Sequence, residues 1–249
     1  MNLIMETCFK VLLTVLLIIS ASFVANAQKL PKVQQESIYA PTNIKIDGKA
    51  TEWDNKFQAY NVSNHLFYTL SNDDKNLYLI VFATDDITYS KIIYGGVTLT
   101  VADIANKKNK ITVTYPVSPM STSNSILLSA HHFDFVANNG KEALMNSINS
   151  HCAAAFKEIK VSGIKGIDDP VSSIYNAQGI KATVLFDNKM AFTYELALPL
   201  KYLDFATDHF RYNIMLNGRT LPEDPRISYP PNYLDSPTDF SGEYTLAKK

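Results

Sequence analysis

Residues 44–54 read IKIDGKATEWD, and this is the most informative stretch of the sequence. Ile44 and Ile46 alternate with polar residues, as in a half-buried β-strand, and the Asp-Gly pair that follows is typical of a tight turn. Trp53, the only tryptophan of the protein, then lies between two acidic residues. We interpret this order as the opening of an exported β-sandwich domain.

A predicted export signal precedes this stretch. The apolar run at 11–23 follows Lys10 and is followed by the small residues Ala25 and Ala27, a pattern typical of signal-peptidase cleavage. The run is shorter than the roughly 20 apolar residues that a membrane-spanning helix needs. We therefore predict a signal peptide at 1–27, no membrane span after its cleavage, and a periplasmic or extracellular protein.

Composition restricts the remaining chain, which we predict to be a single domain at 28–249. The formal net charge is −1 at pH 7, and no basic stripe is present, so nucleic acid is not an expected partner. Signal cleavage would leave Cys152 as the only cysteine, which excludes an intrachain disulfide. Its apolar neighbours favour a small buried side chain over a reactive thiol.

The sequence lacks the motifs of common enzyme classes. It contains no G-x-S-x-G nucleophile elbow, no phosphate-cradling glycine-rich loop and no H-E-x-x-H zinc motif. Its 9 glycines are spread thinly along the chain. We therefore expect a protein that is not an enzyme.

Most of the chain has the pattern of short strands. Apolar and β-branched residues recur at 76–83 and 92–101, and 180–186 with 190–198 form a hairpin pattern around a turn. The further expected strands are 111–115, 126–136, 156–162, 210–217 and 243–247. One helix is expected, at 140–149. The fold class that follows is mainly β: an antiparallel immunoglobulin-like or jelly-roll β-sandwich with one short helix.

Three segments together resemble a known family. They are the I-x-I-D-G and E-W pattern at 44–53, the aromatic-rich strand ending in T-D-D at 77–86, and Y-E-L-A-L-P-L-x-x-L at 194–203. In order and spacing they are similar to the family 9 carbohydrate-binding modules and to the wider DOMON-like superfamily. The resemblance implies a β-sandwich that binds sugars, or haem in other members, and that often accompanies carbohydrate-active enzymes.

We expect ligand contacts from a loop at 221–240 that is rich in proline and tyrosine. Prolines lower the entropy cost of holding a long loop in one conformation, and tyrosines supply flat contact area with a hydrogen-bonding tip. Arginines add forked donors for hydroxyl or carboxylate groups. The candidate ligand-binding residues are Tyr229, Tyr233, Arg219, Arg226 and Trp53. The alternatives are a loop that covers a sheet edge and a Trp53 that fills the core.

A metal site is the second candidate. Asp85 and Asp86 follow the strand at 76–83, and paired carboxylates in a loop are suited to calcium, a hard cation that prefers oxygen ligands. Aspartates are equally common in ordinary turns, so turn chemistry is the alternative reading. A structural calcium ion is the only cofactor expected.

The function that we expect is that of an exported, non-catalytic carbohydrate-binding protein. Its ligand would be an oligosaccharide or polysaccharide held by aromatic loop residues. One alternative is a cell-envelope interaction or structural protein with no sugar site and with an envelope protein as its partner. Another is a DOMON-type haem-binding electron carrier, in which Met and His side chains would serve as axial ligands.

Overall fold

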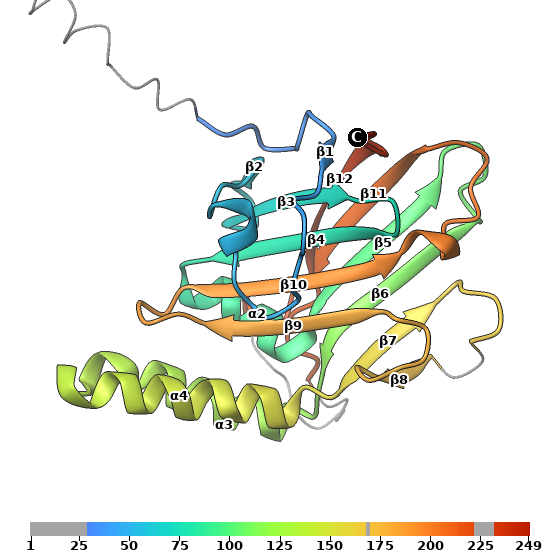
Figure 1. Ribbon diagram of the computed structural model, residues 1–249. Helices are drawn as coiled ribbons and strands as arrows, with labels where there is room; N and C mark the ends of the chain where they lie inside the picture. The colour runs from blue at the N-terminus through green and yellow to red at the C-terminus, as the bar shows by residue number, and fades with distance from the viewer. Residues whose placement is uncertain (1–28, 168–169, 222–231) are drawn as a thin grey trace, which may run out of the picture. The chain divides into compact units, whose positions relative to one another are not determined.

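The computed structural model describes residues 29–167, 170–221 and 232–249. Within these residues, 12 strands form two mostly antiparallel sheets, accompanied by 3 α-helices. The two sheets pack face to face as a β-sandwich (Figure 1). The fold class predicted from the sequence is therefore confirmed, although the helices are more extensive than expected.

The first sheet has the strand order β1-β3-β4-β10-β9, with β2 paired to β3. Its strands are β1 (Ile38–Tyr39), β2 (Ala59–Asn61), β3 (Leu66–Asn72), β4 (Asn76–Ala83), β9 (Lys181–Phe186) and β10 (Phe192–Pro199). The second sheet has the order β12-β11-β5-β6-β7-β8. Its strands are β5 (Val97–Asp103), β6 (Lys110–Val117), β7 (Glu158–Ser162), β8 (Val171–Ser173), β11 (His209–Leu216) and β12 (Thr238–Thr245).

The hairpin expected around 187–189 forms as β9 and β10, which pair with Phe192 opposite Phe186. Every residue of β10 is buried, so both faces of this strand are covered. Tyr194 and Leu196 point into the core between the sheets, as their alternation predicts. The opposite face of the strand packs under another segment of the chain.

That segment is the N-terminal part of the domain, residues 40–57, which covers the outer face of the first sheet. Here Trp53, in a short 3-10 helix η1 (Thr51–Trp53), packs with Tyr78, Ile80 and Ala197 in a second apolar cluster. Ile44 and Ile46 are half-buried against the same cluster with exposed residues between them. The expected alternation is present, but the prediction of a strand here is wrong, because the segment crosses the sheet without pairing to it.

Glu195 of β10 fastens this segment to the sheet. Its Oε2 accepts hydrogen bonds from the backbone N–H groups of Asp47 and Gly48, at 2.8 Å and 2.7 Å. Gly48 has a φ of 83°, and an added Cβ would lie 2.5 Å from the Cβ of Leu185, so only glycine fits this turn. The segments at 44–53 and 194–203 therefore meet at Glu195.

One predicted strand is shortened and another is replaced, because local helix signals prevail. Residues 86–95 form helix α2 (Asp86–Gly95), whose N-terminus is capped by Asp85 and which ends at Gly96 with a φ of 79°. The strand expected at 92–101 therefore begins only at Val97. A capping aspartate and a glycine with positive φ are both ordinary helix boundaries.

The strand expected at 126–136 is replaced by helix α3 (Met120–His131) and a 3-10 turn η2 (Phe133–Phe135). The buried residues of α3 are Ser123, Ile126, Leu127 and Ala130, a spacing of three and four that belongs to a helix. The expected helix at 140–149 is confirmed as part of α4 (Asn138–Ala155). A third 3-10 turn, η3 (Leu200–Tyr202), follows β10.

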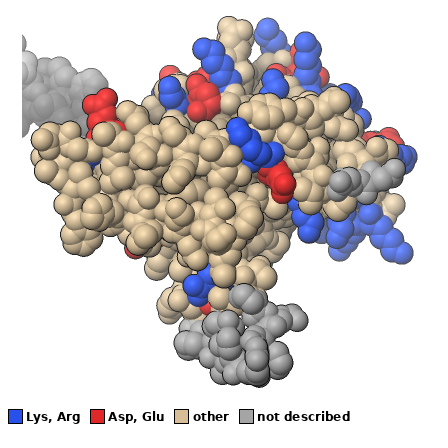
Figure 2. All heavy atoms as spheres, turned by 90° about the horizontal axis from the view of Figure 1, so that it is seen from below, with Lys and Arg blue, Asp and Glu red and all other residues tan. Residues whose placement is uncertain are grey.

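Helices α3 and α4 lie beneath β9 in the view of Figure 1. Asn149 of α4 ties them to the sheet, because its side-chain amide bonds both the N–H and the C=O of Phe186, at 2.9 Å and 2.8 Å. The centre of the face seen in Figure 2 is mainly uncharged, and α3 carries no Lys, Arg, Asp or Glu.

Residues 31–249 form one compact unit. The predicted signal peptide at 1–27 lies outside the described residues. Among the residues that are described, no helix has the length and apolar character needed to cross a membrane.

Candidate functional site

A pocket of about 280 Å³ opens where the β2–β3 turn, the start of α2 and the ends of β11 and β12 come together. It is lined by Ser63, Asn64, His65, Asp85, Ile87, Thr88, Lys91, Leu216, Tyr233 and Thr238. Most of its surface is apolar, and its few polar groups come from four separate segments of the chain. This is the composition of a small-molecule site: an apolar lining with a few placed polar groups.

Asn64 is the most unusual residue of the pocket. It is only 4% exposed, yet neither Oδ1 nor Nδ2 of its carboxamide has a hydrogen-bond partner within the described residues. Its backbone is held at both ends: the N–H donates to Asn61 Oδ1 at 3.1 Å, and the C=O accepts from Thr88 Oγ1 at 3.0 Å. An unsatisfied buried polar group costs about 1–3 kcal/mol. Both atoms are shielded from solvent, so a ligand would recover this free energy only after the lining opens to expose them.

Lys91 supplies a buried positive charge beside it. Only 6% of the residue is exposed, and burial lowers the pKa of its ammonium group. Nζ donates to Thr238 Oγ1 at 3.0 Å, and no acidic partner is found for it within the described residues. Since an ammonium group has three donors, Lys91 has capacity for further acceptors in the pocket.

Asp85 and Tyr233 complete the polar and aromatic parts of the lining. Asp85 Oδ1 accepts from the backbone N–H of Thr88 at 2.9 Å and so caps α2. Tyr233 is 83% exposed at the rim, a position in which a flat ring is available to a ligand. The pocket therefore offers an amide, a cation and an aromatic ring together.

The structure brings two of the sequence-predicted residues, Tyr233 and Asp85, into one pocket, although they were predicted for different roles. Arg219 lies outside it: its guanidinium binds Asp235 through Nε at 2.7 Å and Nη2 at 3.3 Å. This ion pair raises the pKa of Arg219 and occupies the fork that was expected to bind a ligand. Tyr229 and Arg226 lie outside the described residues.

Trp53 is 7% exposed and forms part of the second apolar cluster. Its Nε1 donates to Ser71 Oγ at 3.4 Å, and its ring meets the edge of Tyr78 at 6.4 Å between centroids. The geometry is that of the core residue which the sequence analysis kept as the alternative to a stacking platform. A buried indole offers little ring surface to a sugar.

The two aspartates predicted to bind calcium lie at the N-terminus of α2 in this structure. Asp85 is the cap, and Asp86 is an exposed residue of the first helical turn, where a negative charge suits the helix dipole. Within the described part of the chain, no group of three or more His, Cys, Asp or Glu side chains is arranged to hold a metal ion.

Cys152 is 1% exposed on the inner face of α4. Burial raises the pKa of its thiol to about 12, so the thiolate form that reacts as a nucleophile is suppressed. This agrees with the buried structural role that was expected from its apolar neighbours.

Asn64, Lys91 and Thr238 were missed by the sequence analysis. Among them, only Lys91 could have been noticed in the sequence, because it is the one cationic residue of α2. The three residues are brought together by contacts between distant segments: Thr88 bonds Asn64 across 24 residues, and Lys91 bonds Thr238 across 147.

No family model, curated protein or solved structure matches the chain.

Proposed function

We propose that this chain is an exported, non-catalytic glycan-binding protein that holds one sugar ring in the Asn64 pocket. The observation that carries the proposal is the buried carboxamide of Asn64, which has no hydrogen-bond partner among the described residues and lines the same pocket as Lys91 and an exposed Tyr233. The predicted signal peptide and the resemblance to family 9 carbohydrate-binding modules support the same function.

The chemistry of a pyranose fits these groups. Adjacent sugar hydroxyls act as donor and acceptor at once, and a carboxamide offers both functions on neighbouring atoms. The Lys91 ammonium can donate to a further hydroxyl or ring oxygen, and the apolar C–H face of the ring can pack on Tyr233. A volume of about 280 Å³ is at the lower limit of small-molecule pockets, about 300–1,000 Å³, so one ring is accommodated.

The pocket also lacks what hydrolysis would require. Asp85 is the only carboxylate in its lining, and it caps a helix. Glycosidases use two carboxyl groups on opposite sides of the scissile bond. The described lining therefore supports binding without bond cleavage.

The test is a glycan array on the protein lacking residues 1–27, followed by calorimetric titration of each hit. Tyr233→Ala should weaken binding by about tenfold, since aromatic contacts contribute up to about 1.5 kcal/mol. Asn64→Leu should abolish binding. Because Tyr233 is exposed, its variant should unfold at the same denaturant concentration as the parent protein.

The matched control is Phe135→Ala, which removes an aromatic ring of 82% exposure from η2, outside the pocket. It should leave the affinity unchanged. An array without hits for a well-folded sample would refute the proposal, and so would equal losses in the Tyr233 and Phe135 variants.

A further inference from the structure

A larger groove, of about 900 Å³, lies on the outer face of the first sheet. It runs between the N-terminal segment at 44–46, the β3–β4 turn at 74–76, the loop at 177–179 and the start of η3. None of the residues that line it belongs to the Asn64 pocket. It is thus a separate surface of the protein.

Four lysines line this groove: Lys45, Lys75, Lys181 and Lys201. All four are exposed, and none forms an ion pair within the described residues. Asp74 is the only acidic residue in the lining. The lining therefore has an excess of positive charge in a protein whose formal net charge is −1.

Backbone pairing sets the positions of these lysines. Lys181 lies opposite Ala197 in the β9–β10 ladder, and Ala197 lies opposite Tyr78 of β4. The N–H of Leu200 donates to the C=O of Lys75 at 2.8 Å, which places η3 and Lys201 against the β3–β4 turn. The backbone of the strands and tight turns holds these lysines in position before a ligand binds. A multivalent anion therefore meets a preformed site.

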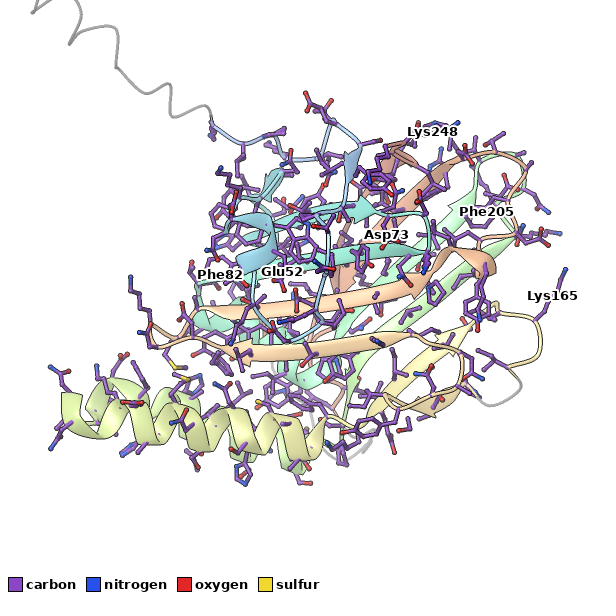
Figure 3. All side chains as sticks on the ribbon, in the orientation of Figure 1. Glu52, Asp73, Phe82, Lys165, Phe205 and Lys248 are labelled. Carbon is purple, nitrogen blue, oxygen red and sulfur yellow. The ribbon has the colours of Figure 1, made fainter. Side chains whose placement is uncertain are left out.

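Asp73, labelled in Figure 3, lies on the β3–β4 turn beside the groove, where its negative charge offsets part of the charge of Lys75. Its Oδ1 accepts from the backbone N–H groups of Lys75 and Asn76, both at 2.7 Å, and its Oδ2 accepts from Tyr78 Oη at 2.8 Å. Burial raises the pKa of Asp73, but these hydrogen bonds outweigh it and the net pKa is lowered. The carboxylate is thus committed to its own turn.

One end of the groove joins a second hollow, of about 420 Å³, that shares Ile46, Gly179 and Lys181 with it. This hollow carries Tyr175, which is 76% exposed. The side-chain amide of Gln178 in the groove has no hydrogen-bond partner within the described residues. An exposed ring and a free amide beside lysines are suited to a sugar that also carries negative charge.

We propose that this groove is a second binding site, for an anionic oligosaccharide whose sugar units carry carboxylate or sulfate groups. The lysines bind the anionic groups, Gln178 bonds a hydroxyl, and Tyr175 packs against a ring. The groove and the hollow that adjoins it are both larger than the Asn64 pocket, so together they receive several linked units, whereas the Asn64 pocket receives one. The site does not depend on the function proposed for that pocket.

The experiment is a calorimetric titration of the protein lacking residues 1–27 with four probes. Oligogalacturonide carries carboxylates, a chondroitin sulfate oligosaccharide carries sulfates, maltohexaose is neutral, and polyphosphate is a polyanion without sugar. Either or both anionic sugars should bind, and the preference between them identifies the anionic group. Binding should weaken by at least about tenfold between low salt and about 0.5 M salt, because exposed charges are screened.

The double variant Lys75→Gln/Lys201→Gln should weaken anionic sugar binding by about tenfold, since each exposed pair contributes modestly. Its matched control, Lys107→Gln/Lys108→Gln, removes the same charge from the exposed β5–β6 turn and should change nothing. Tyr175→Ala should weaken binding to both anionic sugars. Tyr233→Ala should leave it unchanged.

Three results would overturn the inference. The first is no binding of either anionic sugar by a folded protein, which leaves the Asn64 pocket and its own test untouched. The second is equal loss in the two lysine double variants, which would indicate general charge attraction. The third is polyphosphate binding as tight as that of the sugars and insensitive to Tyr175→Ala, which would make the groove a site for polyanions of any kind.

Discussion

Replacing Glu195 by glutamine should remove a loss of stability that the protein undergoes between pH 5 and pH 8. Glu195 is 1% exposed, and its Oε1 has no hydrogen-bond partner within the described residues. Burial raises the pKa of its carboxyl group to about 7, against the opposing effect of the backbone N–H groups of Gly48 and Asp47. The folded protein therefore favours the neutral acid.

The sign and the magnitude follow from this pKa. Because the folded state holds the proton more tightly than the unfolded state, the stabilisation is complete below the unfolded pKa of 4.5 and is lost as the pH rises through about 7. At about 1.4 kcal/mol per pKa unit, the total is about 3 kcal/mol. Most of it, about 2–3 kcal/mol, falls between pH 5 and pH 8.

The assay is urea unfolding of the parent protein and of Glu195→Gln at pH 5, 6, 7 and 8. A glutamine can still accept from both backbone N–H groups but does not titrate, and the other carboxyl groups cancel in the difference. The free energy of unfolding of the parent should fall by about 2–3 kcal/mol relative to the variant across this range. Glu158→Gln, at an exposed position on β7, is the matched control. Parallel curves for the parent and Glu195→Gln would refute the argument.

Three further predictions concern residues singled out by the sequence. Trp53→Ala should lower the free energy of unfolding, measured by circular dichroism, by about 3–5 kcal/mol, because it empties the second apolar cluster. A loss of glycan affinity without a loss of stability would instead make Trp53 a sugar-stacking residue. Asp85→Ala should lower the free energy of unfolding by about 1 kcal/mol through the lost helix cap, equally in calcium and in chelator. Asp86→Ala should lower it by less. A loss of stability seen only with calcium would support the metal site instead. The thiol of Cys152 should resist Ellman's reagent at pH 8 until urea unfolds the protein, and rapid native labelling would contradict its burial.

The sequence predicts elements well where one periodicity prevails over a full strand. The β9–β10 hairpin combines an alternating run with a short polar turn, and no helical reading competes with it. At 92–95 and 126–131 the residues are apolar or small in short runs, which fit a strand and a helix equally well. In these segments, two features determine that a helix forms. They are the helix boundaries, set by the Asp85 cap and Gly96 in α2, and the packing of one helical face in α3.

The candidate site is predictable only in part. Tyr233 and Asp85 stand out by type and position, and both line the pocket. Asn64 and Lys91 are ordinary residues in the sequence, and they become unusual only because folding buries them without full pairing. The lysines of the groove are spread along the sequence from Lys45 to Lys201, so no single stretch indicates that folding places them in one groove.

The N-terminal segment that covers the first sheet has a consequence for the order of assembly. Its turn at 47–48 is made early in synthesis, yet its anchor, Glu195, comes 148 residues later. Trp53 can meet Tyr78 and Ile80 once β3 and β4 have paired, but Ala197 and the Glu195 anchor arrive only with β10, and such long-range pairing is slow. The cover over the first sheet is thus completed late, and its apolar side chains are exposed to aggregation during that interval.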